Sequence, residues 1–153
     1  MTVRGQPTYH VSALERGTVL DHLRAGSALA ALRVLHVPAG VTVTVGIHLA
    51  SPRLGRKDLV KIAGYELTAQ EAAKVALLSP DATFSIIRDF QVVSKRKLEP
   101  PASFRGLLRC PNAACIVHQE RVPGAFRLEA RDPIRVRCDY CERSVPEEQF
   151  DFV

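Results

Sequence analysis

The 153-residue sequence has no tryptophan, a single methionine and no cysteine before residue 110. A membrane-spanning helix needs about eighteen consecutive apolar residues, and no apolar run in the sequence approaches that length. The first ten residues lack the basic and then apolar segments of a secretory signal, and no segment is of low complexity. Apolar residues make up 46% of the chain and charged residues 24%. We therefore expect a globular, cytoplasmic protein with one ordinary domain or two small ones.

The four cysteines form two close pairs near the end of the chain, with the spacings C-x4-C and C-x2-C. Each pair can present two thiolates to one tetrahedral zinc ion. Four thiolates would leave no open coordination position, so the sequence predicts one structural Zn²⁺. Two disulfides or buried free thiols are the alternatives, and disulfides suit a chain without an export signal poorly. The expected ligands are Cys110, Cys115, Cys138 and Cys141, whereas we expect His118 to be a partly exposed histidine.

Residues 101–153 contain few large apolar side chains, so hydrophobic burial alone would stabilise this segment only marginally. Zinc binding to such a site supplies about 10–16 kcal/mol of apparent free energy. Metal binding and folding should therefore be one event. Alternating patterns at residues 125–130 and 134–138 predict a small all-β, zinc-ribbon-like domain.

Residues 1–100 alternate between strand-like and helix-like patterns. The pair Thr68 and Glu71 fits a capping box at the start of a helix that Pro80 ends. The predicted order is strand, helix, strand, strand, helix, strand, strand. This order predicts an α+β ferredoxin-like sandwich, in which two helices cover one face of an antiparallel sheet that has an added edge strand. The expected strands are residues 11–14 with 18–20, 41–49, 59–62, 84–87 and 90–93, and the first helix lies between Ser27 and Pro38.

The charged, proline-containing residues 96–103 (RKLEPPAS) predict a stiff linker, which places a domain boundary near residue 100. Residues 1–100 carry 13 Lys and Arg against 8 Asp and Glu, and residues 101–153 carry 8 of each. The net charge of +5 therefore belongs to the first domain. Four thiolates with one zinc ion would give the second domain a charge of about −2. The basic excess thus does not point to a nucleic-acid surface on the second domain.

Four stretches and their order give the sequence a resemblance to the regulatory chain of aspartate carbamoyltransferase. They are ERGTVLDH at residues 15–22, GRKDLVKI at 55–62, and CPNAACI at 110–116 with CDYCE at 138–142. With residues 80–95, the likeness covers nearly the whole chain. The resemblance implies a non-catalytic allosteric subunit of pyrimidine biosynthesis. Its first domain (1–100) would bind CTP and UTP as inhibitors and ATP as activator, and its zinc domain (101–153) would dock on the catalytic chain.

The resemblance also implies an assembly and a nucleotide site. Two copies would pair through their N-terminal domains, and three such dimers would join two catalytic trimers into a dodecamer, without nucleic acid or membrane as partner. Asp21 and His22 match family residues that contact the ribose and phosphate of the nucleotide. Lys61 matches a lysine near the ribose and base, and Lys95 matches a lysine that binds phosphate. Lys57 is not among these matched positions, and we expect it to be a further phosphate contact. The family residues that line the base and sugar pocket are matched by Val11, Ala13, Leu14, Ile87, Phe90 and Val92.

Two positions depart from the family pattern. Ser85 stands where asparagine is common, and Phe90 stands where tyrosine is common, so both affect expectations about nucleotide preference. The residue chemistry otherwise agrees with the assignment. Lysines suit a triphosphate, which carries about four negative charges, and an aspartate can accept hydrogen bonds from ribose hydroxyls. No G-x-x-x-x-G-K-[ST] pattern is present, so no P-loop is expected.

Without the resemblance, other interpretations of the same residues stay open. Asp21 and His22 would usually form a solvated loop pair, and Lys57, Lys61 and Lys95 would usually be solvated. A zinc-ribbon protein that binds RNA or DNA is the alternative function, although residues 101–153 contain no lysine and no tryptophan. A small metalloenzyme is a third possibility, but it would need an open zinc position or an activated nucleophile.

Overall fold

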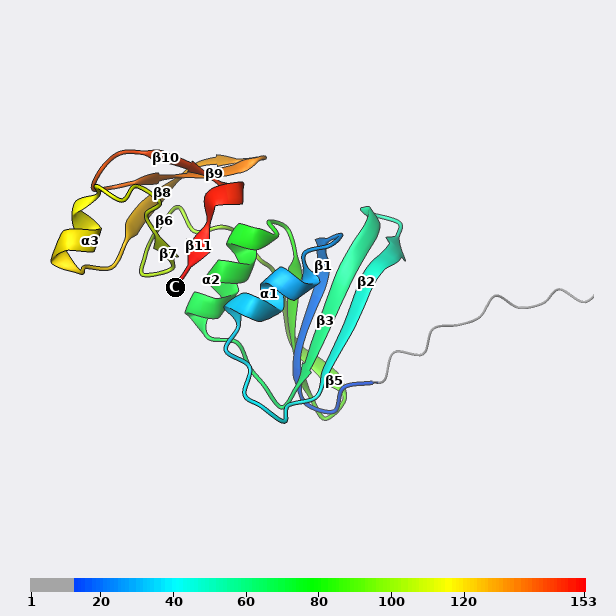
Figure 1. Cartoon of the computed structure of the whole chain (residues 1–153). Coiled ribbons are helices and arrows are strands. Elements are labelled where there is room, and N and C mark those ends of the chain that lie inside the picture. Colours follow the sequence, from blue (N-terminus) through cyan, green and yellow to red (C-terminus); the bar gives the residue numbers. More distant parts are fainter. Residues whose placement is uncertain (1–12) are drawn as a thin grey trace, which may run out of the picture.

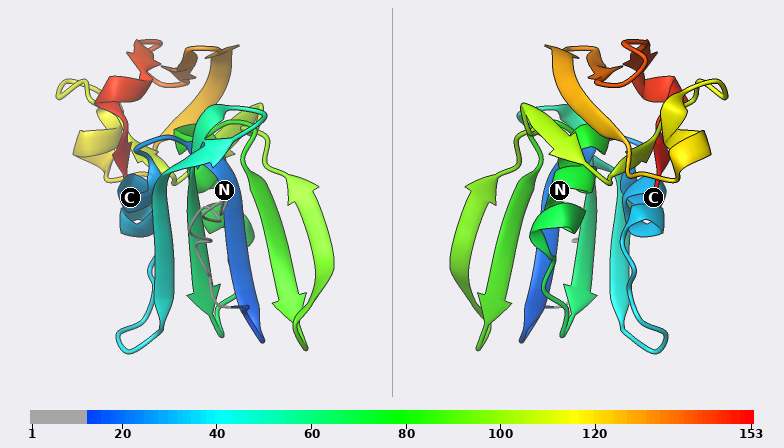
Figure 2. Two further views of the ribbon diagram at one scale, coloured as in Figure 1. Left: turned by 90° about the vertical axis from the view of Figure 1, so that its right-hand side faces the viewer. Right: turned by 90° about the vertical axis from the view of Figure 1, so that its left-hand side faces the viewer.

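The computed structural model describes residues 13–153. In its first part, strands β1 (Gly17–Arg24), β2 (Val43–Ser51), β3 (Gly55–Ala63), β4 (Thr83–Arg88) and β5 (Gln91–Lys97) alternate with helices α1 (Ala28–Val34) and α2 (Ala69–Leu78). The strands form one antiparallel sheet in the order β2-β3-β1-β4-β5. Figures 1 and 2 show both helices on the same side of this sheet. The predicted ferredoxin-like arrangement with an added edge strand is confirmed.

The main core lies between the sheet and the two helices. Because side chains alternate across a strand, residues two apart share a face of the sheet. The fully buried members include Leu20 and Leu23 of β1, Val60 and Ile62 of β3, and Val75 of α2. Burying one such side chain contributes about 1.5–3 kcal/mol, which stabilises the helices on this face. The other face of the sheet carries no helix among residues 13–153, and we call it the open face.

The two helices begin in different ways. At α2 the predicted capping box is present: Thr68 Oγ1 accepts from the Glu71 backbone N–H, and Glu71 Oε2 accepts from the Thr68 backbone N–H. Ser27 precedes α1 but makes no side-chain cap. Instead, Oδ2 of the buried Asp58 accepts from the backbone N–H groups of Gly26 and Ala28 at 2.9 Å each. A distant carboxylate therefore satisfies donors at the start of α1.

The second part of the chain is a small β domain. A four-stranded sheet has the order β10-β9-β8-β6, and β7 pairs with β11. The predicted strands at residues 125–130 and 134–138 are confirmed by β8 and β9. A short helix that the sequence analysis did not predict follows Cys115. The bounds are β6 (Ser103–Arg105), β7 (Leu108–Arg109), α3 (Ile116–Glu120), β8 (Ala125–Arg131), β9 (Ile134–Cys138), β10 (Ser144–Pro146), a 3₁₀ turn (Glu147–Gln149) and β11 (Asp151–Phe152).

Several predicted boundaries differ from the structure. Strand β3 starts at Gly55 rather than Leu59, and β5 runs to Lys97, so part of the expected linker belongs to the sheet. Leu98 follows β5 and is buried in the main core. Hydrogen bonding to a neighbouring strand extended both elements beyond their apolar patterns. The domain boundary near residue 100 stays a prediction.

The C-terminal segment connects the two cores. Phe152 of β11 packs against both hydrophobic clusters, and Leu77 of α2 belongs to the core of the second part. The ammonium group of Lys74, a buried residue of α2, donates a hydrogen bond to the main-chain oxygen of Val153. Across residues 13–153, no helix is long and apolar enough to cross a membrane.

Candidate functional site

The four cysteine side chains converge on one point in the second part of the chain. Their sulfur atoms all lie within 4.8 Å of one another. The Sγ atoms of Cys110 and Cys141 are 3.6 Å apart, and those of Cys115 and Cys138 are 3.9 Å apart. A tetrahedron with metal–sulfur bonds of about 2.3 Å has edges of about 3.8 Å. The cluster therefore has the dimensions of a four-thiolate metal site.

Backbone folding and burial set the protonation of these thiols. Burial raises the pKa of Cys138, although the N–H groups of Cys141 and Tyr140 oppose it. Burial also raises the pKa of Cys110. Burial acts in the same direction on Cys141, but hydrogen bonds from Arg143 and Asn112 outweigh it and lower its pKa to about 7. The cluster thus combines buried sulfurs with N–H donors, as thiolate ligands of a metal require.

His118 lies outside this set of ligands. Its side chain is exposed, and Nε2 lies 2.9 Å from the carbonyl oxygen of Cys110, to which it donates. All four cysteines are free of disulfide bonds. The expected ligand set, without His118, is therefore the one that the structure brings together.

The register of the first sheet places three candidate residues, together with Val19, in one row on the open face. Val19 of β1 pairs with Lys61 of β3 on one side and with Ser85 of β4 on the other. Ser85 in turn pairs with Lys95 of β5. Paired residues project from the same face of a sheet, and Lys61 and Lys95 are three strand spacings apart, about 14 Å. The row therefore presents two cations, Lys61 at one end and Lys95 at the other, with Val19 and Ser85 between them.

A second group adjoins this row. Lys57 Nζ lies 2.8 Å from Asp21 Oδ1, which also accepts from the backbone N–H of His22 at 2.6 Å. The Nδ1 atom of His22 is 2.6 Å from Thr83 Oγ1. Burial alone would raise the pKa of Asp21, but hydrogen bonds from Lys57 and His22 outweigh it and lower the pKa. Asp21 is therefore an ionised acceptor among cationic and polar groups.

A β-bulge creates this second group. The register of β1 against β3 shifts between Leu20 and Leu23, and His22 has a φ of 54°. The extra residue lets Leu20 and Leu23 both enter the main core although they are three residues apart. Asp21, which lies between them, stays on the open face with Lys57. Sequence patterns do not show such a bulge, and they also missed Thr83 as the partner of His22.

The apolar candidates are less closely grouped. Ile87 and Val92 are register partners at the end of the sheet beyond Ser85, where Ile87 is buried and Val92 is exposed. Phe90, predicted to begin a strand, instead lies in the turn with a φ of 62° and is 65% exposed. Its backbone N–H donates to the Glu15 carbonyl at 3.0 Å. Ala13 is exposed and Leu14 half-buried before β1, and Val11 lies outside the described residues.

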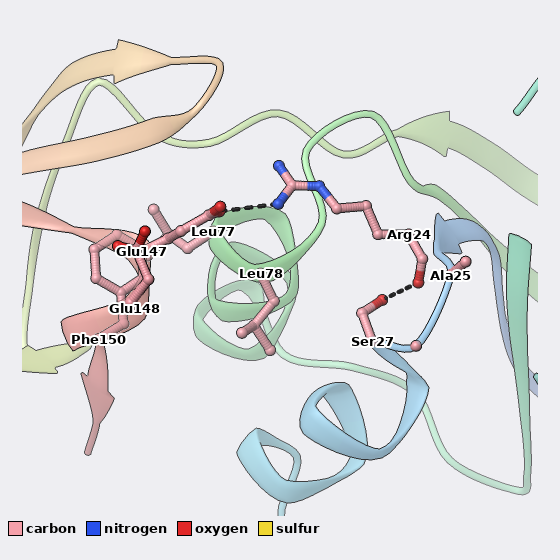
Figure 3. A pocket seen from close by; sticks show the side chains of 9 residues that line it. Arg24, Ala25, Ser27, Leu77, Leu78, Glu147, Glu148 and Phe150 are labelled. Atoms are coloured by element: carbon pink, nitrogen blue, oxygen red, sulfur yellow. Dashed lines mark hydrogen bonds and ion pairs between the residues drawn. The ribbon is translucent and has the colours of Figure 1, made fainter.

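A third feature lies where the two parts of the chain meet. A cavity of about 280 Å³ is lined by Arg24, Ser27 and Leu78 from the first part and by Glu147 and Phe150 from the second. Figure 3 shows the Arg24 guanidinium reaching across to the Glu147 carboxylate, and the ion pair measures 2.9 Å. Arg24 follows Asp21 on β1 and pairs with Lys57 in the sheet register. This contact was not anticipated from the sequence, because no local pattern marks it.

The fold and these sites define a two-domain binding protein with a closed metal-binding module. Two sequence models of known families match the chain. The one described as aspartate carbamoyltransferase regulatory chain, allosteric domain, matches residues 9–99, and the one described as the metal binding domain of the same chain matches residues 103–151. The protein belongs to the family of aspartate carbamoyltransferase regulatory chains.

Individual relatives agree with this assignment. The aspartate carbamoyltransferase regulatory chain of Methanopyrus kandleri is 46% identical over 142 residues, which cover 91% of each chain. Those of Pyrococcus abyssi and Methanocaldococcus jannaschii are 44% and 41% identical, over 91% and 92% of this chain and 93% and 95% of theirs. These relatives are regulatory chains and not catalytic ones, so the expectation of a non-enzymatic regulatory subunit is confirmed.

Proposed function

We propose that the open face of the first domain binds CTP, UTP and ATP, and that these nucleotides regulate aspartate carbamoyltransferase in the cytoplasm. The observation that carries the proposal is the row Lys61–Val19–Ser85–Lys95, which adjoins the group formed by Asp21, His22 and Lys57. Sequence-distant cations thereby share one surface with an ionised aspartate. This combination suits a nucleoside triphosphate, whose phosphates need cations and whose ribose offers hydroxyl donors.

Each polar residue has a distinct part in this proposal. Lys95 and Lys57 contact phosphate groups, and Lys61 lies near the ribose and base. Asp21 accepts a hydrogen bond from a ribose hydroxyl. In the structure the Lys57 ammonium lies 2.8 Å from the Asp21 carboxylate, so the hydroxyl and the ammonium compete for the same acceptor. His22 contacts ribose or phosphate and is held by Thr83. Ile87 and Val92, which pair at the end of the sheet beyond Ser85, line the base and sugar pocket with Ala13, Leu14, Phe90 and Val11.

The metal of the second domain is, in this proposal, one structural Zn²⁺ held by the four cysteines. A set of four sulfur donors at tetrahedral spacing fits zinc, and it leaves no open position for a substrate. The ion would supply folding free energy to a module with a small core. The folded module then docks on the catalytic chain, so that three regulatory dimers join two catalytic trimers in a dodecamer.

Regulation in this assembly is a difference in affinity between two states. CTP and UTP would bind more tightly to the less active state, and ATP to the more active one. A coupling of about 1–3 kcal/mol is usual for such systems. The contacts between the domains, including Arg24 with Glu147 and Phe152 with both cores, are the parts of this chain through which such a bias can pass.

Calorimetric titration of the zinc-loaded chain with CTP tests the nucleotide site. We expect Lys61→Ala and Lys95→Ala each to weaken CTP binding by about tenfold, because each removes a cation worth about 1.5–3 kcal/mol in a charge-assisted hydrogen bond. Arg33→Ala is the matched control, since Arg33 is an exposed cation of α1 on the opposite side of the sheet. Unchanged isotherms for both lysine variants would refute this placement of the site.

A further inference from the structure

The two cysteine pairs meet sulfur to sulfur across the metal site. The Sγ atoms of Cys110 and Cys141 are 3.6 Å apart, and those of Cys115 and Cys138 are 3.9 Å apart. Each contact joins one cysteine of the first pair to one of the second, over 31 and 23 positions of sequence. A disulfide bond is about 2.0 Å long, so a small approach of two sulfur atoms would connect the two halves of the site covalently.

The four sulfurs differ in their access to solvent. Cys110, Cys115 and Cys138 are buried, whereas Cys141 is half-buried. The difference follows from the local fold, because Cys138 ends strand β9 and Cys141 lies in the turn after it. A reagent in solution therefore reaches the Cys141 sulfur first. Susceptibility of a cysteine to oxidation follows its exposure, so Cys141 is the first point of attack, and the Cys110 sulfur is within reach to respond.

We propose that this site is a redox switch, in which a hydroperoxide converts Cys141 and Cys110 to a disulfide and the chain then releases its metal and its catalytic partner. The inference rests on the proposed zinc and on the proposed docking of the metal-binding module. It adds to them a chemical signal, an oxidant, to which the regulatory chain responds independently of nucleotides.

The oxidation takes two steps. The Cys141 thiolate attacks one oxygen of the hydroperoxide, so that an S–O bond forms, the O–O bond breaks, and the departing oxygen takes a proton from water. Cys141 is then a sulfenic acid. The Cys110 thiolate attacks this sulfur, so that the S–S bond forms, the S–O bond breaks, and hydroxide leaves and is protonated. The two thiolates together lose two electrons, and the hydroperoxide gains both.

The disulfide removes two of the four sulfur donors. Cys115 and Cys138 remain, and two thiolates cannot complete a tetrahedral site. The cysteines belong to the core of the metal-binding module, so loss of the metal removes folding free energy from it. The module then loses the surface that docks on the catalytic chain. A thiol reductant reverses the change by exchange, which restores both thiolates and allows zinc to bind again.

The test treats the full-length, zinc-loaded chain with hydrogen peroxide beside a chromophoric zinc indicator, and then alkylates the remaining thiols. Trypsin cuts after arginine and gives one peptide for each cysteine pair, residues 110–121 and 138–143. The proposed disulfide joins these two peptides, whereas a disulfide within either pair leaves them separate. We expect loss of one zinc ion per chain and joined peptides whose fragmentation places the alkyl groups on Cys115 and Cys138.

Two matched substitutions test the choice of sulfur. Cys141→His keeps four ligands, since three cysteines and one histidine form a natural zinc site, but it cannot form the disulfide. We expect it to retain its zinc over the time in which peroxide strips the original chain. Cys115→His makes the same ligand change at a buried position outside the proposed bond, and it should lose zinc as the original chain does. Equal zinc loss from the two variants would count against Cys141 as the point of attack.

The peptide map of the original chain decides the proposal even where a variant does not bind zinc. Separate peptides, or a Cys141 oxidised without a partner, would overturn the switch, and so would an oxidised chain that still co-purifies with the catalytic chain. Metal analysis before peroxide tests the proposed zinc separately. Co-purification of the untreated chain tests the proposed docking separately, and dithiothreitol with Zn²⁺ should restore the association after oxidation.

Discussion

Arg24 and Glu147 are 123 positions apart in the sequence, and their side chains form an ion pair of 2.9 Å between the two domains. Arg24 lies at the end of β1 beside the Asp21–Lys57 group, and Glu147 begins the 3₁₀ turn that precedes β11. The pair therefore connects the proposed nucleotide site to the part of the chain that packs on the metal-binding module (Figure 3).

The energetic contribution of this pair should be small. The two side chains are 43% and 31% exposed, so solvent screens their attraction. A double-mutant cycle with Arg24→Ala and Glu147→Ala should give a coupling of about 0.2–1 kcal/mol in the free energy of unfolding. Urea denaturation at low and high salt measures it, and the coupling should shrink as salt rises. A coupling above this range would indicate that solvent is excluded from the pair.

The buried contact of Lys74 should contribute more. Lys74 is 6% exposed and donates to the main-chain oxygen of Val153. Lys74→Met keeps the apolar stem but removes the donor, so we expect a loss of about 1–3 kcal/mol in the free energy of unfolding, with zinc content unchanged. Arg33→Met, an exposed cation on α1, serves as the control and should change stability by less than about 0.5 kcal/mol.

Asp58 should make stability depend on pH in the acidic range. Burial would raise its pKa, but hydrogen bonds from the backbone N–H groups of His48, Ala28 and Gly26 outweigh that effect, so the pKa lies below 3.8. A carboxyl group whose pKa is lower in the folded state stabilises the fold above its unfolded pKa. That stabilisation is lost as pH falls through the folded pKa.

Asp58→Asn tests this expectation. At about pH 7 the variant should be less stable by about 1–3 kcal/mol, because one amide cannot accept from all three donors. The difference between the two proteins should narrow as pH falls below 3.8, where the carboxylate itself becomes protonated. Hydrogen exchange at the start of α1 measures it locally. A difference that stays constant with pH would contradict the role of the charge.

Removal of the metal should abolish the function of the second domain and leave that of the first domain intact. The cysteines form part of the core of the second module. Without a cation, the four sulfurs either repel one another as thiolates or become protonated, and we expect either change to unfold the module. We expect a chelator- or mercurial-treated chain to lose association with the catalytic chain in co-purification, while CTP binding persists. Hydrogen exchange should rise in β6 to β11 and not in the sheet β1 to β5. An apo chain that still binds the catalytic chain would refute the docking assignment.

Local patterns predicted much of the fold correctly. The capping box at Thr68 and Glu71 is present because all its contacts lie within one helical turn. The cysteine spacing identified the metal site for a similar reason, since each pair is a local turn that presents two sulfurs. The order of strands and helices also fixed the sheet topology, because few right-handed arrangements satisfy that order.

Other features depend on contacts between distant segments. Asp58 caps α1 from the middle of β3, and β5 extends to Lys97 because it pairs with β4. Phe90 lies in a turn rather than a strand, since the tight reversal there needs positive φ angles at Asp89 and Phe90. No pattern of apolar residues carries this information.

The sequence by itself determined the four clustered cysteines, the order of helices and strands in the first sheet, and the residue types of the proposed nucleotide site. The tertiary structure alone decided that Lys61, Ser85 and Lys95 share one row, because register is a property of paired strands. It also decided that a bulge at His22 turns Asp21 toward Lys57 and that Arg24 meets Glu147. These relationships arise from packing between segments that are far apart in the chain, and local residue preferences do not specify them.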